Sequence, residues 1–255
     1  MRRQGLMVGA IGVIILALAG CAQNTTVQKP QADRNKLAEI NLELGVQYMQ
    51  SREFQTAMDK LNKAIELNPR YVDAHNAMGL LRAVLGQNEQ AETSFKQALH
   101  IDPANASAMN NYGQFLCQRG RYDEGQKLFA TAAADPLYQN PEKVLNNAGS
   151  CAVSAGKLDV AEDFFRKALE IDHQLTPALL QLAEVNFQRK RFLPARGYLQ
   201  RYIEVAQHSP KSLWLGIQIE RELGDRNAEA SYALLLERNF PDAPQTKLLL
   251  ESKPQ

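Results

Sequence analysis

The chain has 255 residues, of which 45% are hydrophobic and 22% are charged, and its formal net charge is +1. These values describe an ordinary globular protein. They exclude both the charge excess of a disordered chain and the basic character of a nucleic-acid-binding protein. Because there is one Trp and aromatic residues make up 7% of the chain, the core must consist mainly of Leu, Ala and Ile, a mixture that favours helices.

Residues 1–20 have the features of a lipoprotein signal peptide. Met1-Arg2-Arg3 is a basic start, and residues 6–18 are apolar and uncharged, a stretch too short to cross a bilayer core of about 30 Å comfortably. The run Leu18-Ala19-Gly20-Cys21 that follows resembles the bacterial lipobox. The resemblance implies cleavage before Cys21 and a covalent lipid on its sulfur. The alternative is an ordinary leader in which the Cys occurs by chance.

Residues 21–37 are expected to form a lipidated polar tether. The segment that follows the Cys reads AQNTTVQKPQADRNK and carries almost no apolar side chain. By resemblance to bacterial lipoprotein sorting, Ala22 directly after the lipidated Cys implies the outer membrane rather than the inner one. We therefore expect a protein anchored by lipid at the periplasmic face of the outer membrane, with no cofactor other than the lipid on Cys21.

An internal repeat fills most of the remaining chain. Gly45, Gly79 and Gly113 are spaced by 34 residues, and a matching position recurs up to Gly216. Two further series advance in the same steps: Ala57, Ala91, Gly125, Ala161, Ala195, Ala228 and Leu61, Phe95, Phe129, Phe165, Leu199, Tyr232. Small residues let two helices approach closely while the large side chain fills the space beside them. Each unit is therefore expected to be a helical hairpin that stacks on its neighbours, because one hairpin alone cannot bury its apolar faces.

This pattern resembles the tetratricopeptide repeat. The resemblance implies an all-α fold, a right-handed superhelical solenoid of about six helix hairpins. We expect the solenoid to span residues 38–241, with repeats at 38–71, 72–105, 106–139, 142–175, 176–208 and 209–241. Residues 242–255 are expected to hold a C-terminal capping helix. The longer step beside Asp135-Pro136 predicts a bend between the third and fourth repeats.

No motif predicts catalysis or a metal site. The sequence has no glycine-rich phosphate loop, no G-x-S-x-G, no H-E-x-x-H and no C-x-x-C, and its 4 His residues have no ligand spacing. We therefore expect a protein that is not an enzyme and that has no metal ion, no small-molecule substrate and no nucleic-acid partner.

Cys117 and Cys151 lie late in the first helices of consecutive predicted repeats. They could face each other across a repeat interface, and an oxidising periplasm would permit a disulfide. The alternative is two small buried thiols without a bond.

A partner site is predicted in the groove that the first helices of such repeats line. Mapping the groove positions onto this sequence gives an apolar stripe in the first two repeats and neutral side chains, such as Gln114, Asn146 and Ser150, in the next two. The predicted partner-binding residues are Leu42, Val46, Met49, Asn76, Leu80 and Asn110. The apolar residues would anchor a helix or an extended segment, and the two Asn residues would set its register. The alternative is that the tether or adjacent helices cover this stripe.

The lipobox, the polar tether and the repeats together resemble the type IV pilus biogenesis/stability lipoproteins of the PilF/PilW family. The runs NNYGQFL at 110–116 and RFLPAR at 191–196, with the inserted Leu137-Tyr138, carry the resemblance. It implies a pilotin, an outer-membrane lipoprotein that escorts secretin subunits and promotes their multimerisation. Two other classes remain open: a lipoprotein adaptor for peptidoglycan hydrolases or proteases, and a component of outer-membrane protein assembly.

Overall fold

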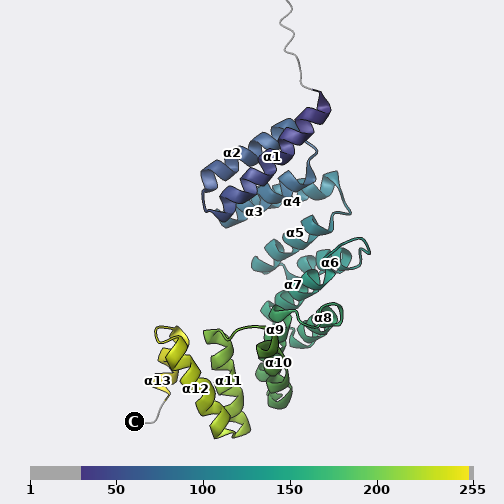
Figure 1. The fold of residues 1–255 in the computed structure, drawn as a ribbon. Helices are drawn as coiled ribbons and strands as arrows, with labels where there is room; N and C mark the ends of the chain where they lie inside the picture. The colour runs from purple at the N-terminus through teal and green to yellow at the C-terminus, as the bar shows by residue number, and fades with distance from the viewer. Residues whose placement is uncertain (1–29, 253–255) are drawn as a thin grey trace, which may run out of the picture.

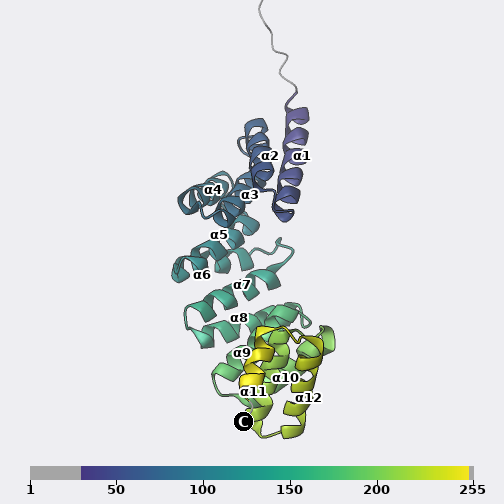
Figure 2. The ribbon, with the colours of Figure 1, turned by 90° about the vertical axis from the view of Figure 1, so that its left-hand side faces the viewer.

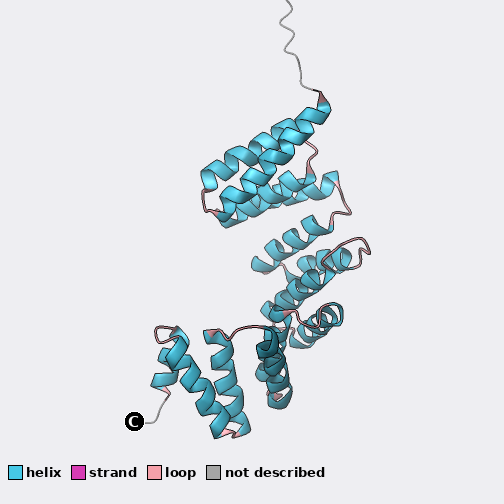
Figure 3. Ribbon diagram, viewed as in Figure 1, coloured by secondary structure: helices cyan, strands magenta, loops and turns pink. Residues whose placement is uncertain are grey.

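The computed structural model describes residues 30–252, which form 13 helices and no strand (Figure 3). The predicted signal peptide, Cys21, residues 22–29 of the predicted tether and residues 253–255 of the predicted cap lie outside the described residues. Within residues 30–252, no helix combines the length and the apolar character needed to cross a bilayer.

Twelve of the helices pair into six hairpins, one in each predicted repeat. The hairpins are α1 (Gln31–Gln50) with α2 (Phe54–Leu67), α3 (Val72–Val84) with α4 (Asn88–Ile101), α5 (Ala106–Gln118) with α6 (Tyr122–Ala133), α7 (Pro141–Ser154) with α8 (Leu158–Ile171), α9 (Thr176–Gln188) with α10 (Phe192–Val205), and α11 (Pro210–Leu223) with α12 (Arg226–Asn239). They follow one another along a curved rod, with α1 and the marked C-terminus at opposite ends (Figures 1 and 2). The predicted all-α solenoid of helix hairpins is confirmed.

The turn inside each hairpin depends on a residue in the left-handed conformation. Gly86 and Gly156 adopt it with φ of 73° and 71°, which costs glycine little because it has no Cβ. In the first and fifth hairpins Arg52 and Lys190 adopt the same conformation, with φ of 62° and 59°. The turn geometry is therefore imposed by the hairpin even where the sequence supplies no glycine.

The two helices of a hairpin approach closely at the small-residue positions. A Cβ at Gly79 would lie 2.7 Å from a ring carbon of Phe95, and one at Gly113 would lie 2.8 Å from the ring of Phe129. Both rings are buried, with at most 1% of their surface exposed. The small residue of the first helix and the large residue of the second helix thus form a pair, in which the ring fills the space where the glycine has no side chain.

The start of α1 corrects the predicted tether. The helix begins at Gln31, so residues 31–37 are helical and do not belong to a tether that extends to residue 37. These residues are mostly good helix formers and follow Pro30, which carries no N–H that a helix start would leave unpaired. The Arg34 guanidinium also donates a hydrogen bond of 3.4 Å to the Glu66 carbonyl on α2, so the added turns contact the first hairpin.

The first helices of the hairpins form the inner surface of the curve. Consecutive first helices contact one another, from α1 and α3 through to α9 and α11, whereas among the described residues no two consecutive second helices do. Elements on the inside of a curved stack lie closer together than those on the outside. The concave face therefore belongs to α1, α3, α5, α7, α9 and α11.

Helix α13 (Pro244–Glu251) closes the last hairpin. Leu249 on α13 is 3% exposed and packs with Leu213, Ile217 and Leu236 of α11 and α12. A short helix after the sixth repeat thus covers apolar side chains that a seventh repeat would otherwise have to cover.

Candidate partner-binding groove

The inner groove is the concave face formed by the first helices, and its N-terminal end is apolar. Val46 on α1 and Leu80 on α3 occupy equivalent repeat positions and are each 36% exposed. Val84, one turn beyond Leu80 on α3, is 63% exposed. We refer to Val46, Leu80 and Val84 as the apolar patch. Val84 was not among the residues selected from the sequence, although it occupies a groove position of the second repeat.

Two residues of the predicted stripe belong to the core instead. Leu42 and Met49 are half-buried and pack against the cluster of Ala57, Leu61, Ala77, Met78 and Leu81. Helices α2 and α3 both pack on α1, so the side of α1 that carries these two residues is covered. The alternative that adjacent helices cover the stripe holds for Leu42 and Met49, and the exposed part of the groove is the apolar patch.

The middle of the groove carries a row of Asn side chains that bond to one another. Asn111 on α5 donates to Asn76 Oδ1 on α3 at 3.2 Å, and Asn147 on α7 donates to Asn110 Oδ1 on α5 at 2.9 Å. A longer contact of 3.4 Å runs from Asn110 Nδ2 to Asn111 Oδ1. We refer to these four residues as the amide ladder, because its bonds join three consecutive inner helices.

The amide ladder corrects the role predicted for Asn76 and Asn110. Both are buried, with 8% and 9% of their surface exposed, and each side-chain carbonyl already accepts a hydrogen bond from the next inner helix. They set the register between repeats rather than the register of a partner. Their donors, Asn111 and Asn147, were not selected from the sequence, and the adjacent Asn pairs at 110–111 and 146–147 are the signal that marks them.

Two cavities lie beside the amide ladder. One of about 410 Å³ is bounded by α5, the 134–140 connection, α7 and the start of α9, with Asn146 in its lining. The other, of about 170 Å³, lies between α5 and α7 and includes Gln114 and Ser150. The middle of the groove is therefore hollow as well as polar.

Cys117 and Cys151 form a disulfide that joins α5 to α7, with their Cα atoms 5.6 Å apart. Of the two alternatives that the sequence left open, the structure thus has the bonded one. Space beside the bridge is tight, since a Cβ at Gly125 would lie 2.5 Å from Cys117 Sγ. This explains why a glycine replaces the alanine found at that repeat position in neighbouring hairpins.

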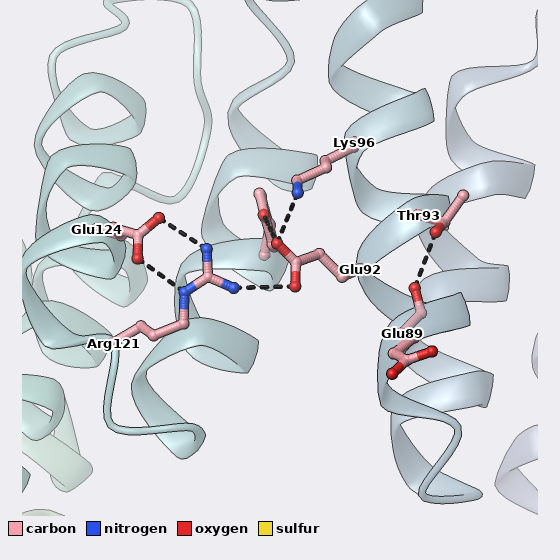
Figure 4. A network of polar contacts seen from close by, with 7 residues as sticks. Glu89, Glu92, Thr93, Lys96, Arg121 and Glu124 are labelled. Atoms are coloured by element: carbon pink, nitrogen blue, oxygen red, sulfur yellow. Dashed lines mark hydrogen bonds and ion pairs between the residues drawn. The ribbon is translucent and has the colours of Figure 1, made fainter.

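A charged network fixes the second hairpin to the third (Figure 4). Glu92 on α4 accepts from Lys96 Nζ at 2.8 Å and from Arg121 Nη1 at 2.9 Å, and the Tyr112 hydroxyl donates to it at 2.8 Å. Arg121 also pairs with Glu124 at 2.7 Å. The hydrogen bond from Lys96, followed by those from Arg121 and Tyr112, lowers the pKa of Glu92 to about 2.

These contacts make Glu92 a permanent anion at physiological pH rather than a proton donor. Burial, followed by the hydrogen bond to Glu92, raises the pKa of Tyr112 above its ordinary value, so its hydroxyl stays protonated and keeps donating. The network therefore links the second hairpin to the third through an ionised carboxylate. Among residues 30–252, no three His, Cys, Asp or Glu side chains gather in a way that could hold a metal ion.

Comparison with known proteins agrees with this architecture. Tetratricopeptide repeat family models match residues 60–93 and 105–174. The chain is 30% identical over 231 residues to the type IV pilus assembly protein PilF of Pseudomonas aeruginosa, covering 90% of this chain and 92% of the relative.

Two solved structures have the same fold. The P. aeruginosa PilF structure has a TM-score of 0.76 at 28% identity, covering 87% of this chain and 100% of the other. The crystal structure of PilW, described as a widely conserved type IV pilus biogenesis factor, has a TM-score of 0.77 at 31% identity, covering 85% and 99%. Because the sequence match and the shared solenoid extend over nearly the whole chain, this protein belongs to the PilF/PilW family of tetratricopeptide-repeat proteins of type IV pilus biogenesis.

Proposed function

We propose that this protein is an outer-membrane lipoprotein that binds secretin subunits of the type IV pilus system, escorts them to the outer membrane and promotes their multimerisation. The observation that carries the proposal is the 30% identity to a type IV pilus assembly protein over 90% of the chain. A helical scaffold with an open groove suits a protein that holds other proteins rather than one that transforms a substrate.

The apolar patch is the part of the groove that suits a protein anchor. Val46, Leu80 and Val84 expose aliphatic surface on two adjacent inner helices. A few well-buried side chains carry most of the binding energy of an interface, so two or three apolar side chains of a secretin segment would be enough to hold it here. The lipid proposed on Cys21 would keep the bound subunit at the outer membrane.

The test compares a deletion strain with strains that carry single substitutions. We expect deletion to abolish surface pili and to leave secretin monomers, or multimers trapped at the inner membrane, measured by immunoblotting of separated membranes. Val46→Glu places a charge in the anchor site and should weaken secretin capture by about 2 kcal/mol, because the charge has no partner once the interface closes. The free protein should stay folded, since the side chain at position 46 reaches solvent.

Leu193→Glu is the matched control. Leu193 is 66% exposed on α10, an outer helix, so the same substitution adds a charge outside the groove and should leave capture unchanged. Cys21→Ser should release the protein from the outer membrane and remove labelled palmitate. Normal secretin multimers in the deletion strain would rule out the pilotin role and favour the cell-wall adaptor instead.

A further inference from the structure

The outer face of α12 differs from the outer faces of the preceding hairpins. Leu234 on α12 lies two residues after Tyr232, which belongs to the repeating series of large side chains. The equivalent residue of every earlier hairpin is polar: Lys63, Gln97, Thr131, Lys167 and Arg201. Leu234 is nevertheless 66% exposed. The last outer helix therefore presents an apolar side chain at a position that the other hairpins fill with a hydrophilic one.

A hollow of about 480 Å³ lies beside Leu234. Its apolar lining comes from Ala230, Ala233 and Leu234 on α12 and from Leu249 on α13, two helices at the C-terminal end of the rod (Figure 1). Helix α13 has 8 residues, whereas the first helices α3 and α5 have 13 each. The cap is therefore shorter than the first helix of another repeat, and it leaves an apolar part of α12 open.

Opposite charges flank this apolar centre on the same face of α12. Arg226 lies one helical turn before Ala230, Glu237 lies one turn after Ala233, and all four line the hollow. The midpoint between positions 226 and 237 is also the midpoint between positions 230 and 233. Reversing the helix about that point exchanges Arg226 with Glu237 and Ala230 with Ala233. The face is therefore complementary to an antiparallel copy of itself.

We propose that this face is a dimer interface, in which α12 of one protomer packs antiparallel on α12 of its partner about a two-fold axis between positions 231 and 232. Arg226 faces the partner's Glu237, and the symmetry repeats this pair on the other side of the axis. Ala230 faces the partner's Ala233, where small side chains let the two helices approach closely. Leu234 enters the partner's hollow.

The order of the charges along α12 identifies the occupant as a second copy. A face that carried one sign of charge would repel its own copy, whereas here each end of the apolar centre carries the sign that the antiparallel partner needs. A single pair of helices buries less surface than the roughly 1,600 Å² of a standard interface, so the dimer should be reversible. The inference goes beyond the proposed function and does not depend on it.

The test uses two copies of the full chain that carry different affinity tags. They are expressed together in a strain that lacks the secretin and are solubilised from membranes in mild detergent. Capture through one tag should recover the other copy. Leu234→Glu in both copies should lower that recovery on the order of tenfold, because two charges enter the apolar centre.

The matched control is Leu193→Glu in both copies. Leu193 has the same exposed fraction of 66% and lies on α10, another outer helix, so this change should leave recovery unchanged. Circular dichroism of each variant measures whether it is folded.

Charge reversal tests the antiparallel register. Arg226→Glu in both copies places carboxylates against each other, and Glu237→Arg in both copies places guanidinium groups against each other, so each should lower recovery. When one copy carries Arg226→Glu and the other carries Glu237→Arg, both pairs again have opposite signs and recovery should return. The mixed pair keeps the inference testable even if Leu234→Glu does not fold.

The inference is overturned if Leu234→Glu and Leu193→Glu give equal recovery, or if the mixed charge variants recover no more than the matched ones. Absence of any recovery with wild-type copies would also overturn it and would leave the face to a different protein. Because the strain has no secretin, co-capture is independent of the pilotin role. Normal secretin multimers in a deletion strain would refute that role and leave the dimer intact.

Discussion

At the scale of single residues, charged side chains at one repeat position join the second, fourth and fifth hairpins to the hairpin that follows. Glu92, Glu162 and Arg196 occupy this position on α4, α8 and α10. Glu92 pairs with Arg121, Glu162 pairs with Arg189 at 2.6 Å, and Arg196 reverses the polarity by pairing with Glu220. The position carries a negative charge in two hairpins and a positive charge in the third. What these residues share is therefore the ion pair between repeats and not the sign of their charge.

Glu92→Gln should make the protein less stable at neutral pH but not at low pH. The folded-state pKa of Glu92 lies at about 2, below the ordinary value of 4.5, so its contribution is fully present above pH 4.5 and is lost as the pH falls towards 2. Because the Arg121 side chain is 36% exposed and solvent screens the pair, we expect the contribution to be about 1 kcal/mol.

Urea unfolding followed by circular dichroism at a series of pH values measures this difference. The control is Glu66→Gln, which removes a pair with Lys63 in which the Glu66 side chain is 68% exposed, and it should change stability by no more than a few tenths of a kcal/mol. A difference between wild type and Glu92→Gln that stays constant from pH 7 to pH 2 would show that the charge on Glu92 contributes nothing.

At the scale of the helix pair, some glycines inside helices are required by a close contact and others are not. Gly149 on α7 lies against Phe165 on α8, where a Cβ would come within 2.6 Å of a ring carbon. Gly197 on α10 has no atom within 4 Å of the position that a Cβ would take. The first glycine is required by the helix contact, whereas the second only weakens its helix.

Gly149→Ala and Gly197→Ala should therefore shift the melting temperature in opposite directions. Overpacking against a buried ring costs about 1–3 kcal/mol, which exceeds the gain in helix propensity, so Gly149→Ala should destabilise the protein. Gly197→Ala meets nothing and should stabilise it by about 0.5–1 kcal/mol. Thermal melts followed by circular dichroism distinguish the two. Equal changes in melting temperature for the two variants would mean that the Phe165 ring can move to make room for a Cβ at position 149.

At the scale of the whole molecule, the solenoid has a series of small cores rather than one large one. The buried apolar side chains form clusters in successive parts of the chain, from one around Leu61 to one around Leu213. In such an array each repeat contacts mainly its neighbours, so stability adds up interface by interface. The Cys117–Cys151 disulfide crosses one of these interfaces near the middle of the rod, where it joins α5 to α7.

Reduction of this disulfide should destabilise the middle of the solenoid. The bridge closes a loop with a sequence separation of 34, for which the loss of chain entropy in the unfolded state corresponds to about 3–4 kcal/mol. Melting with and without a phosphine reductant measures the effect. The double variant Cys117→Ala and Cys151→Ala should melt at the lower temperature under both conditions. If reductant leaves the wild-type melting temperature unchanged, the bridge adds no stability.

The sequence by itself determined the features that repeat. Equal steps between Gly79 and Gly113 and between Phe95 and Phe129 predicted the hairpins and the side chains at the close contact within them. These features depend on contacts within one repeat, whose two helices are close in the chain, so a local pattern is enough to specify them.

The tertiary structure alone decided which residues of the groove are available to a partner. It assigned Leu42 and Met49 to the core but left Val46 and Leu80 exposed, although all four match groove positions. It likewise joined the Asn110 and Asn147 side chains and left Asn146 Oδ1 without a partner among the described residues. The physical reason is that these outcomes depend on how one repeat packs on the next. That packing depends on connection length and helix rotation, which the spacing within a repeat does not encode.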